Sequence, residues 1–426
     1  MQVFKFGGAS ISTVERCIAL KNILQQQPPG PLMIVMSAMG KTTNALEKVA
    51  EAWYHHRQAE ALQLFEQVKQ QHITLAKYLL VTEYNACTQR MLDFFTEAEW
   101  LLHDRPTHSY DYYYDQIVCL GEMLSTTILS HYLTQEGLPT QWIDVRDLLR
   151  TDSNFRDATV NWEETTQLVH QSLAPALHQG HWVLTQGFVG STTDNESTTL
   201  GREGSDYTAA IFAHILEATS LTIWKDVPSV MNADPRLLPD AQPLPRLSYA
   251  EVLEMAYYGA QVIHPKTIKP LYQKGIPLYV KCFLDTSLPG TIITSQAVPQ
   301  LPPIYVVKPN QTLMQFTSRQ CSFIGEHAIG QILQLLEAEG IKPNLSQNGA
   351  VAYTAIADGH RPHKLQHIAL QAEQWVDVSL LPGLELLTVR HYTHAAIERQ
   401  LMGRTPLLVQ QTPDTWQAVV HPKTQG

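Results

Sequence analysis

The 426-residue sequence lacks features that would point to several classes of protein. Its five cysteines are scattered and never in C-x-x-C spacing, which argues against zinc and disulfides and favours reduced thiols in the cytoplasm. None of its 18 histidines has metal-ligand spacing such as H-E-x-x-H, so no metal-binding residues are expected among them. No apolar run reaches the roughly 18–20 residues that span a membrane, and Lys5 and two glycines interrupt the place of a signal peptide. The formal net charge of −10, without a Lys/Arg cluster, argues against nucleic acid as a main partner.

What is present is an ordinary globular balance, with 44% hydrophobic and 16% charged residues, enough for two or three domains. The first part of the chain alternates strand and helix signals, which favours a parallel sheet covered by helices. We expect strands at Val3–Phe6, Pro31–Ser37, Gln141–Asp144, Trp182–Gly187 and Leu221–Lys225. We expect helices at Thr43–His103, Asp115–Leu133, Ser205–Glu217 and Ser248–Tyr258, the first of these being an inserted helical excursion or lid.

A proline-rich stretch at Thr294–Pro303 marks a domain boundary, beyond which the elements become shorter. Strands are expected there at Leu313–Thr317, Val351–Ile356, Val376–Leu380, Leu384–Arg390, Leu407–Gln411 and Trp416–Val420. Helices are expected at His327–Glu339, Lys364–Gln374 and Thr393–Met402. Two βαβ-like units in the short region that follows the proline-rich stretch predict a small α+β module for ligand binding or dimerisation.

The segment Lys5–Ser10 follows the first expected strand and has the form of a phosphate-binding turn. Gly7 and Gly8 let the backbone approach a ligand closely, and a helix starting near Ser12 or Thr13 would present its N–H groups to an anion. Lys5 could neutralise an oxygen that gains charge during phosphoryl transfer. The P-loop pattern is absent, and a glycine pair after a strand is by itself also compatible with a purely structural turn.

Three further segments carry candidate site residues. Gly201–Asp206 precedes an expected helix, which Ser205 could cap, and Arg202 could grip a carboxylate in a bidentate fork. Trp224–Pro228 begins where a strand ends, and Asp226 there could face a nucleotide. Gly121-Glu122 opens a turn within a helical stretch, where a lone glutamate is also compatible with simple solvation.

Seven motifs in one order resemble those of aspartate kinase, a member of the amino acid kinase superfamily. They are Lys5–Ser10, Ser37–Asn44, Cys119–Ser125, Gln186–Phe188, Gly201–Ala209, Trp224–Arg236 and Tyr258–Ile268. The resemblance covers about the first 295 residues. The remainder resembles, more weakly, the paired ACT domains that follow the kinase domain in that family, the second of them trimmed.

The resemblance implies a three-layer αβα fold with a mainly parallel central sheet in residues 1–295, with the helical insertion at about 43–115. It implies a smaller α+β ACT-like region at 304–426. The implied reaction uses ATP and Mg²⁺ to phosphorylate the β-carboxylate of L-aspartate, which gives 4-phospho-L-aspartate, the entry to lysine, threonine and methionine biosynthesis. A carboxylate is already a competent nucleophile, so such an enzyme needs no strong general base.

The resemblance also implies roles for individual residues. Lys5 matches the lysine that neutralises the transferring group, and Asp206 matches the aspartate that organises the reacting groups. Arg202 and Glu122 match the residues that hold the substrate carboxylate and amine. The remaining substrate positions are Ser37, Thr43, Phe188 and Ser205, and the nucleotide positions are Lys5, Gly7, Gly8, Ser10, Lys225, Asp226, Met231, Arg236 and Gln261.

The chain departs from the family pattern at a few of these positions. Gln261 stands where many members carry a lysine, Lys225 where threonine is common, Met231 where tyrosine is common, and Glu203 where glycine is common. We expect Lys225 or Lys266 to restore the missing cation; the alternative is that both are surface lysines.

Two other functions compete with an active aspartate kinase. Gln261 alone favours a catalytically silent amino-acid or nucleotide sensor, and the third possibility is a kinase of glutamate or N-acetylglutamate. Glu122 together with Arg202 favours a substrate with a free amine and a carboxylate. The resemblance further implies a homodimer through the ACT-like region and an amino-acid feedback effector, although the trimmed region could serve dimerisation only.

Overall fold

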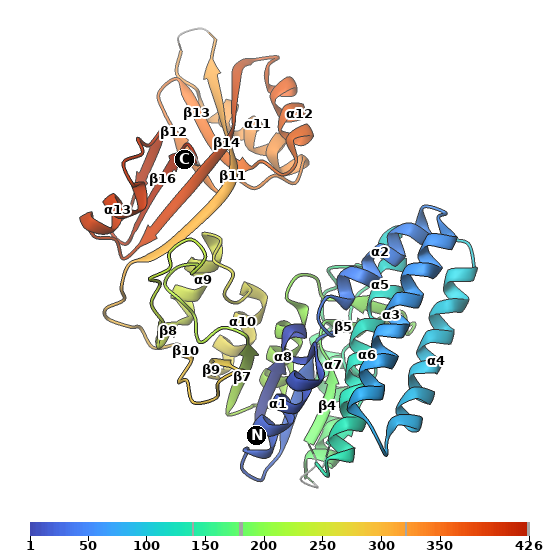
Figure 1. The fold of residues 1–426 in the computed structure, drawn as a ribbon. Helices are drawn as coiled ribbons and strands as arrows, with labels where there is room; N and C mark the ends of the chain where they lie inside the picture. Colours follow the sequence, from blue (N-terminus) through green and yellow to red (C-terminus); the bar gives the residue numbers. More distant parts are fainter. Residues whose placement is uncertain (139, 179–181, 320–321, 424–426) are drawn as a thin grey trace. The chain divides into compact units, whose positions relative to one another are not determined.

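The structure, a computed structural model, describes residues 1–138, 140–178, 182–319 and 322–423. Cys321 therefore lies outside the described residues. The chain divides into two compact units (Figure 1). Unit 1 contains residues 1–230, 243–253 and 261–298, and unit 2 contains residues 231–242, 254–260 and 299–426. Two short segments that precede the proline-rich stretch thus pack with the C-terminal region.

Unit 1 is built on an eight-stranded sheet in which every pairing is parallel except that of β9 with β10. The strand order is β3-β4-β2-β1-β7-β9-β10-β8. The strands are β1 (Gln2–Phe6), β2 (Leu32–Met36), β3 (Thr140–Trp142), β4 (Trp182–Gln186), β7 (Ser220–Lys225), β8 (Arg246–Ser248), β9 (Leu278–Cys282) and β10 (Thr291–Thr294). A separate hairpin pairs β5 (Val189–Ser191) with β6 (Ser197–Thr199).

Helices cover both faces of this sheet, which confirms the three-layer αβα fold (Figure 1). The helices up to residue 274 are α1 (Val14–Gln25), α2 (Thr42–Tyr54), α3 (Gln58–Leu79), α4 (Tyr84–His103), α5 (Tyr110–Val118), α6 (Leu120–Gln135), α7 (Trp162–His178), α8 (Gly204–Ile215), α9 (Tyr249–Tyr257) and α10 (Pro265–Lys274), with short 3₁₀ turns η1 (Gly8–Ile11) and η2 (Val145–Asp147). Of these, α3 and α4 pack on other helices, and the last four residues of α9 belong to unit 2. The sequence did not predict α7 or α10.

The central strand β1 shows how the sequence positions the site. Successive side chains of a strand point to opposite faces of a sheet. Phe4 and Phe6 therefore enter the hydrophobic core that contains α1 and α6. Lys5 points to the opposite face, where α8 packs against β1. A cation is thus placed on the innermost part of the sheet, only 8% exposed.

The helical excursion expected at Thr43–His103 is three helices, α2, α3 and α4, rather than one continuous run. The chain bends at His56, which has a φ of +61°, and again after Leu80, which is extended. No glycine or proline occurs between residues 43 and 103, so the sequence gives no local signal for these bends. The bends let each helix pack against the one before it and bury their shared apolar face.

Unit 2 contains a six-stranded antiparallel sheet in the order β12-β13-β11-β14-β16-β15. The strands are β11 (Ile304–Ser318), β12 (Leu345–Asn348), β13 (Ala352–Asp358), β14 (Val376–Arg390), β15 (Leu408–Gln411) and β16 (Thr415–Val420). The helices are α11 (Glu326–Ala338), α12 (Pro362–Ala372) and α13 (His394–Leu401). One half of the sheet carries α11 and α12, and the other half carries α13.

The prediction of separate strands at Val376–Leu380 and Leu384–Arg390 was wrong, because both belong to the continuous strand β14. The intervening Pro382-Gly383 resembles a turn, but Gly383 takes a φ of +74° and the pairing with β11 continues on both sides of a register shift. Two long strands, β11 and β14, therefore run through both halves of the sheet.

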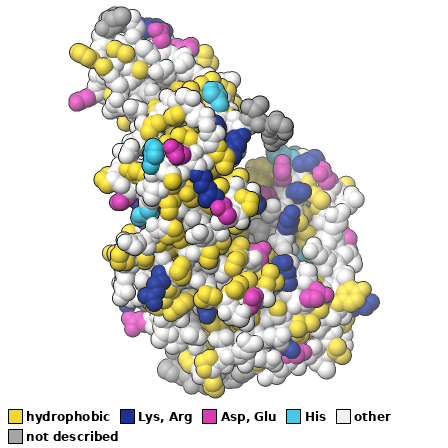
Figure 2. Space-filling model, turned by 60° about the vertical axis from the view of Figure 1, so that its left-hand side comes forward, with side chains coloured by type: hydrophobic (Ala, Val, Ile, Leu, Met, Phe, Trp, Pro, Cys, Tyr) yellow, Lys and Arg dark blue, Asp and Glu magenta, His cyan; other side chains and the backbone are white. Residues whose placement is uncertain are grey.

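The structure also bears on the expectations about membrane spans, surface charge and cysteines. Among the described residues, no helix combines the length and the apolar character needed to cross a bilayer. On the face drawn in Figure 2, acidic and basic side chains are interspersed. The described cysteines Cys17, Cys87, Cys119 and Cys282 are buried free thiols.

Candidate active site

The candidate site lies where parallel strands of unit 1 end. The carboxyl ends of β1, β2, β4 and β7 meet at one edge of the sheet, the usual ligand edge of an open α/β fold. A cavity of about 550 Å³ opens there. It is lined by Lys5, Gly7, Gly8, Ala9, Ser10, Ser37, Thr43, Tyr114, Glu122, Arg156, Phe188, Thr199, Gly201, Arg202, Glu203, Gly204, Ser205, Asp206, Trp224, Lys225 and Asp226.

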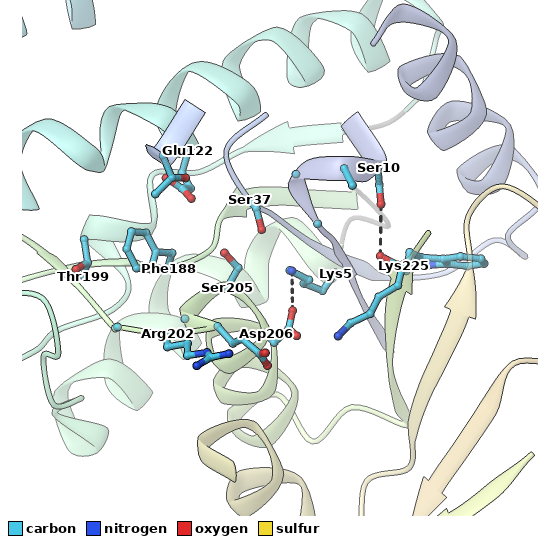
Figure 3. A pocket seen from close by; sticks show the side chains of 18 of the residues that line it. Lys5, Ser10, Ser37, Glu122, Phe188, Thr199, Arg202, Ser205, Asp206 and Lys225 are labelled. Atoms are coloured by element: carbon cyan, nitrogen blue, oxygen red, sulfur yellow. Dashed lines mark hydrogen bonds and ion pairs between the residues drawn. The ribbon is translucent and has the colours of Figure 1, made fainter. Parts of the chain in front are cut away.

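A buried ion pair occupies the centre of this cavity (Figure 3). The Lys5 Nζ lies 2.6 Å from Oδ1 of Asp206, which stands in the first turn of α8. Burial favours the neutral form of Asp206, but the positive charges of Lys5 and Lys225 outweigh it and hold the pKa of this carboxyl below its ordinary value. Asp206 is therefore ionised at neutral pH and fixes the position of the lysine ammonium.

Glu122 is a second buried carboxyl of the cavity, 2% exposed and placed in the first turn of α6. Its Oε1 accepts a hydrogen bond from the Ala38 N–H at 3.0 Å, whereas its Oε2 has no partner among the described residues. Burial raises the pKa of Glu122 to about 8, against the opposing effect of the Ala38 N–H and the charge of Lys5. A buried carboxylate oxygen without a partner is suited to a ligand cation.

In the first glycine turn, Gly8 is packed too tightly for a side chain. A Cβ on Gly8 would lie 2.5 Å from the Ala38 carbonyl oxygen and 3.1 Å from that of Gly40. Gly7 precedes η1, and Ser10 within it is buried and donates to the Trp224 carbonyl oxygen at 3.4 Å. The helix expected from Ser12 or Thr13 begins at Val14, with Thr13 as its N-cap.

The prediction that Ser205 caps the following helix was wrong. Helix α8 begins one residue earlier, and its N-cap is Glu203, whose backbone is left-handed with a φ of +54°. Glu203 tolerates this conformation while its Oε2 accepts the His264 N–H at 2.9 Å. Ser205 lies instead inside the first turn, close to Gly187, whose added Cβ would meet the Ser205 Cβ at 2.6 Å.

Of the two lysines considered as substitutes for a cation at position 261, the cavity contains Lys225. Its Nζ donates to the Val262 carbonyl oxygen at 2.7 Å and points toward Lys5 and Asp206 (Figure 3). The Lys266 ammonium instead pairs with Asp157 and does not line this cavity. Gln261 is exposed and is not among the lining residues.

The remaining predicted nucleotide residues are placed outside the cavity lining. Met231 and Arg236 belong to unit 2, and the Arg236 guanidinium pairs with Asp234 at 2.7 Å, with 84% of its side chain exposed. The other predicted site residues all line the cavity. Arg202 is exposed, and no hydrogen bond or ion pair joins its guanidinium to another described residue.

Several lining residues were not predicted. Ala9, Gly201, Glu203, Gly204 and Trp224 lie inside motifs that the sequence already showed, so a contiguous reading of those motifs would have included them. Tyr114, Arg156 and Thr199 lie in no motif. They reach the cavity because α5, the turn that contains Arg156 and the β5–β6 hairpin fold together.

The chain is similar to known proteins over most of its length. Residues 1–282 match the Amino acid kinase family. Lysine-sensitive aspartokinase 3 of Escherichia coli is 32% identical over 322 residues, which cover 74% of this chain and 69% of that protein. The chain belongs to the aspartokinases of the amino acid kinase family. Aspartokinase 3, chloroplastic, of Arabidopsis thaliana is 30% identical over 91% of this chain and 71% of its own length.

The chain is also similar to a bifunctional relative and to solved structures of an aspartokinase. The chain spans about a third (32%) of the bifunctional aspartokinase/homoserine dehydrogenase 1 of Zea mays, with 33% identity over the shared part. The structure of E. coli aspartokinase III in complex with aspartate and ADP has a TM-score of 0.82 and 25% identity, and covers 99% of this chain and 96% of its own. The complex of the same enzyme with lysine and aspartate has a TM-score of 0.80.

Proposed function

We propose that this chain transfers the γ-phosphoryl group of ATP to the β-carboxylate of L-aspartate, giving 4-phospho-L-aspartate and ADP. The observation that carries the proposal is the buried Lys5–Asp206 pair beside the unpartnered Oε2 of Glu122 in one cavity. The E. coli aspartokinase III that binds aspartate and ADP supports the same pair of ligands.

Lys5 and Asp206 act on the transferring group. The attacking β-carboxylate is already nucleophilic, so the protein must hold two anions together and neutralise the charge that passes between them. Lys5 supplies a positive charge whose position is fixed by Asp206 at 2.6 Å. The turn at Gly7 and Gly8, which is closely packed at Gly8, brings backbone N–H groups to the phosphates. A preorganised cation of this kind loses little energy to reorganisation during the reaction.

The amino-acid subsite lies around Glu122 and Arg202. Glu122 has a free carboxylate oxygen for the substrate ammonium, and Arg202 has an uncommitted guanidinium for a carboxylate. Because Glu122 and Arg202 carry opposite charges, the subsite favours a substrate that has both an amine and a carboxylate. The proposed neighbours in this subsite are Ser37, Thr43, Phe188 and Ser205, all of which line the cavity.

The nucleotide subsite is proposed around Lys5, Gly7, Gly8, Ser10, Lys225 and Asp226, all of which line the cavity. Met231, Arg236 and Gln261 do not line it, and the structure gives no support to a nucleotide contact for them. Lys225 takes the place of the cation that Gln261 does not provide, since its ammonium lines the cavity and already acts on Asp206. Among the described residues no cluster of three or more His, Cys, Asp or Glu side chains could hold a metal ion. Mg²⁺ needs only one or two carboxylates together with phosphates, and Asp206 and Asp226 fit an ion that arrives with ATP and neutralises phosphate charge.

Regulation and assembly are proposed for unit 2. The paired ACT-like halves support a homodimer and an amino-acid effector, and the lysine complex of E. coli aspartokinase III makes lysine the first effector to test. We place the enzyme at the entry to lysine, threonine and methionine biosynthesis. The buried free thiols fit a cytoplasmic location.

The function is tested by following ADP release with ATP and L-aspartate, and by trapping the acyl phosphate with hydroxylamine as a hydroxamate. Release of ADP that requires both substrates and yields the hydroxamate supports the proposal. Equal rates with glutamate or N-acetylglutamate, or no turnover with any of the three acids, would reject it. A thermal-shift series with lysine, threonine and methionine tests the effector, because a ligand of the folded state raises its Tm.

A further inference from the structure

Arg156 lines the active-site cavity although no sequence motif surrounds it. It lies in a turn between Thr151 and Val160, which form an isolated β-bridge with each other, and its backbone takes a φ of +71°. A positive φ is unfavourable for a side chain of this size, and such conformations persist where the surrounding structure holds them, most often at functional sites.

A buried carboxylate holds the backbone of Arg156 in place. Asp115 on α5 is fully buried, and its Oδ2 accepts the Arg156 N–H at 2.9 Å. The same carboxylate accepts the Thr199 N–H at 2.8 Å and the Thr199 hydroxyl at 2.7 Å. Arg156 is therefore fixed to Thr199, another residue of the cavity wall, through one shared partner.

The Arg156 guanidinium is held much more weakly than its backbone. It lies 4.4 Å from the centre of the Tyr114 ring and pairs with Asp111 at 3.0 Å. Both members of the ion pair are exposed, with 41% of the arginine and 56% of the aspartate side chain accessible. An exposed pair of this kind contributes little to stability, so another carboxylate can replace Asp111 at small cost.

The position of Arg156 indicates which part of a substrate it would meet. A Cβ on Gly201 would lie 3.2 Å from the Arg156 carbonyl oxygen, so the arginine backbone packs against the residue that precedes Arg202. In Figure 3, Arg202 and Thr199 occupy the end of the cavity opposite Lys225. Arg156 and Arg202 thus lie at the amino-acid end of the cavity, and Lys225, which we propose as a nucleotide contact, lies at the opposite end.

We propose that Arg156 is a second guanidinium for the α-carboxylate of the amino-acid substrate, acting with Arg202 and leaving Asp111 when the substrate binds. The inference rests on the proposed function, in which the β-carboxylate faces Lys5 and the amine faces Glu122. The α-carboxylate is then the remaining charged group, and it lies toward the arginines. Arg156 sets specificity by requiring a charged α-carboxylate rather than a neutral group at that position.

The test compares L-aspartate with its α-amide, which keeps the amine and the β-carboxylate but has no α-carboxylate. Arg156→Gly removes the guanidinium and also relieves the positive φ, so the folded protein should keep or raise its Tm. We expect the KM for aspartate to rise at least tenfold and the KM for ATP to change less than twofold. The kcat/KM for the α-amide should stay unchanged.

Two further variants separate binding from a structural role. Arg156→Lys keeps a charge and should recover part of the aspartate affinity. Asp111→Asn removes only the resting partner and should leave the aspartate KM unchanged or lower. A loss in Asp111→Asn as large as that in Arg156→Gly, or equal losses for aspartate and its α-amide in Arg156→Gly, would overturn the inference.

The proposed function and this inference fail in different ways. If the wild-type chain releases no ADP with aspartate, the proposed function is rejected. If the wild-type chain is active and Arg156→Gly keeps the wild-type KM for aspartate, only the role of Arg156 is rejected.

Discussion

Replacing Glu122 by glutamine should stabilise the protein while it weakens aspartate binding, and both effects should depend on pH. The substitution preserves the acceptor for the Ala38 N–H and replaces the unpartnered Oε2 by an amide group. It removes the buried negative charge that we propose as the partner of the substrate ammonium. Stability and affinity therefore move in opposite directions.

The sign of the stability effect follows from the raised pKa. Glu122 has an ordinary pKa of 4.5 and a folded-state pKa of about 8, so the folded chain holds this proton more tightly than the unfolded chain. The wild-type protein accordingly loses stability as the pH rises from about 4.5 to about 8, and glutamine does not. At about 1.4 kcal/mol per pKa unit, the shift of roughly 3.5 units corresponds to at most about 5 kcal/mol.

Two measurements check this reasoning. Thermal unfolding of wild-type and Glu122→Gln protein should give similar Tm values at pH 5 and a higher Tm for the variant at pH 9. In the wild type, the aspartate KM should rise as the pH falls below about 8, approaching tenfold per pH unit, because Glu122 must release its proton to pair with the amine. The variant should raise the KM at pH 8.5 at least thirtyfold, the loss expected on removing one partner of a buried charge pair.

Specific outcomes would refute the argument. An aspartate KM that is flat between pH 6.5 and 8.5 in the wild type would show that no buried proton is displaced by the substrate. A Tm difference that is the same at pH 5 and pH 9 would assign the stability effect to packing rather than to charge. Glu97→Gln, an exposed position on α4, serves as the matched control and should change neither quantity.

Three further predictions concern the phosphate end of the cavity. Lys225→Met should raise the KM for ATP about tenfold or more with little change in the aspartate KM. Lys266→Met should leave the ATP KM unchanged, because the Lys266 ammonium pairs with Asp157 and does not line the cavity. Equal effects of the two substitutions on the ATP KM would refute the role of Lys225. Lys5→Met should lower kcat by about 10²–10³-fold, because it removes the cation at the transferring group. It should also destabilise the fold by about 3–5 kcal/mol, because it leaves the buried Asp206 carboxylate without its partner. A kcat within tenfold of wild type would contradict the role of Lys5. Gly8→Ala should abolish turnover by displacing the phosphate turn, since the new Cβ would lie 2.5 Å from a carbonyl oxygen, and wild-type ATP affinity in a folded Gly8→Ala protein would show that the turn does not contact the nucleotide.

The sequence predicted the layered kinase fold well because its strands are buried apolar runs that end at recognisable turns. β1, β2, β4 and β7 were each placed to within about one residue of their bounds. What it did not show was the set of bends between α2, α3 and α4, where no glycine or proline marks a break. Those bends are imposed by the packing of one helix on the next, which is a property of the folded chain.

The same contrast holds for the candidate site. Gly8 could be predicted because a glycine pair after a strand allows close backbone approach, and Asp206 could be predicted from the resemblance of its motif to that of aspartate kinases. Arg156 could not, because its place in the cavity depends on a hydrogen bond from its backbone to Asp115, 41 positions earlier in the chain. At Pro382-Gly383 the sequence predicted a turn that the structure does not have, because pairing with β11 keeps β14 continuous through these residues.

The central place of β1 has a consequence for how the chain is made. β1 pairs on one side with β2 and on the other with β7, whose first residue, Ser220, is 214 positions after Phe6. At about 5–20 residues per second, a ribosome needs on the order of 10–40 s to deliver β7. During that time β1 is an open edge of a highly apolar sheet, the kind of edge that pairs with other chains. Asp206, which pairs with Lys5 in the folded chain, is made only shortly before β7. Until then Lys5 keeps an unpaired positive charge on β1, and this charge opposes pairing of the edge with other chains.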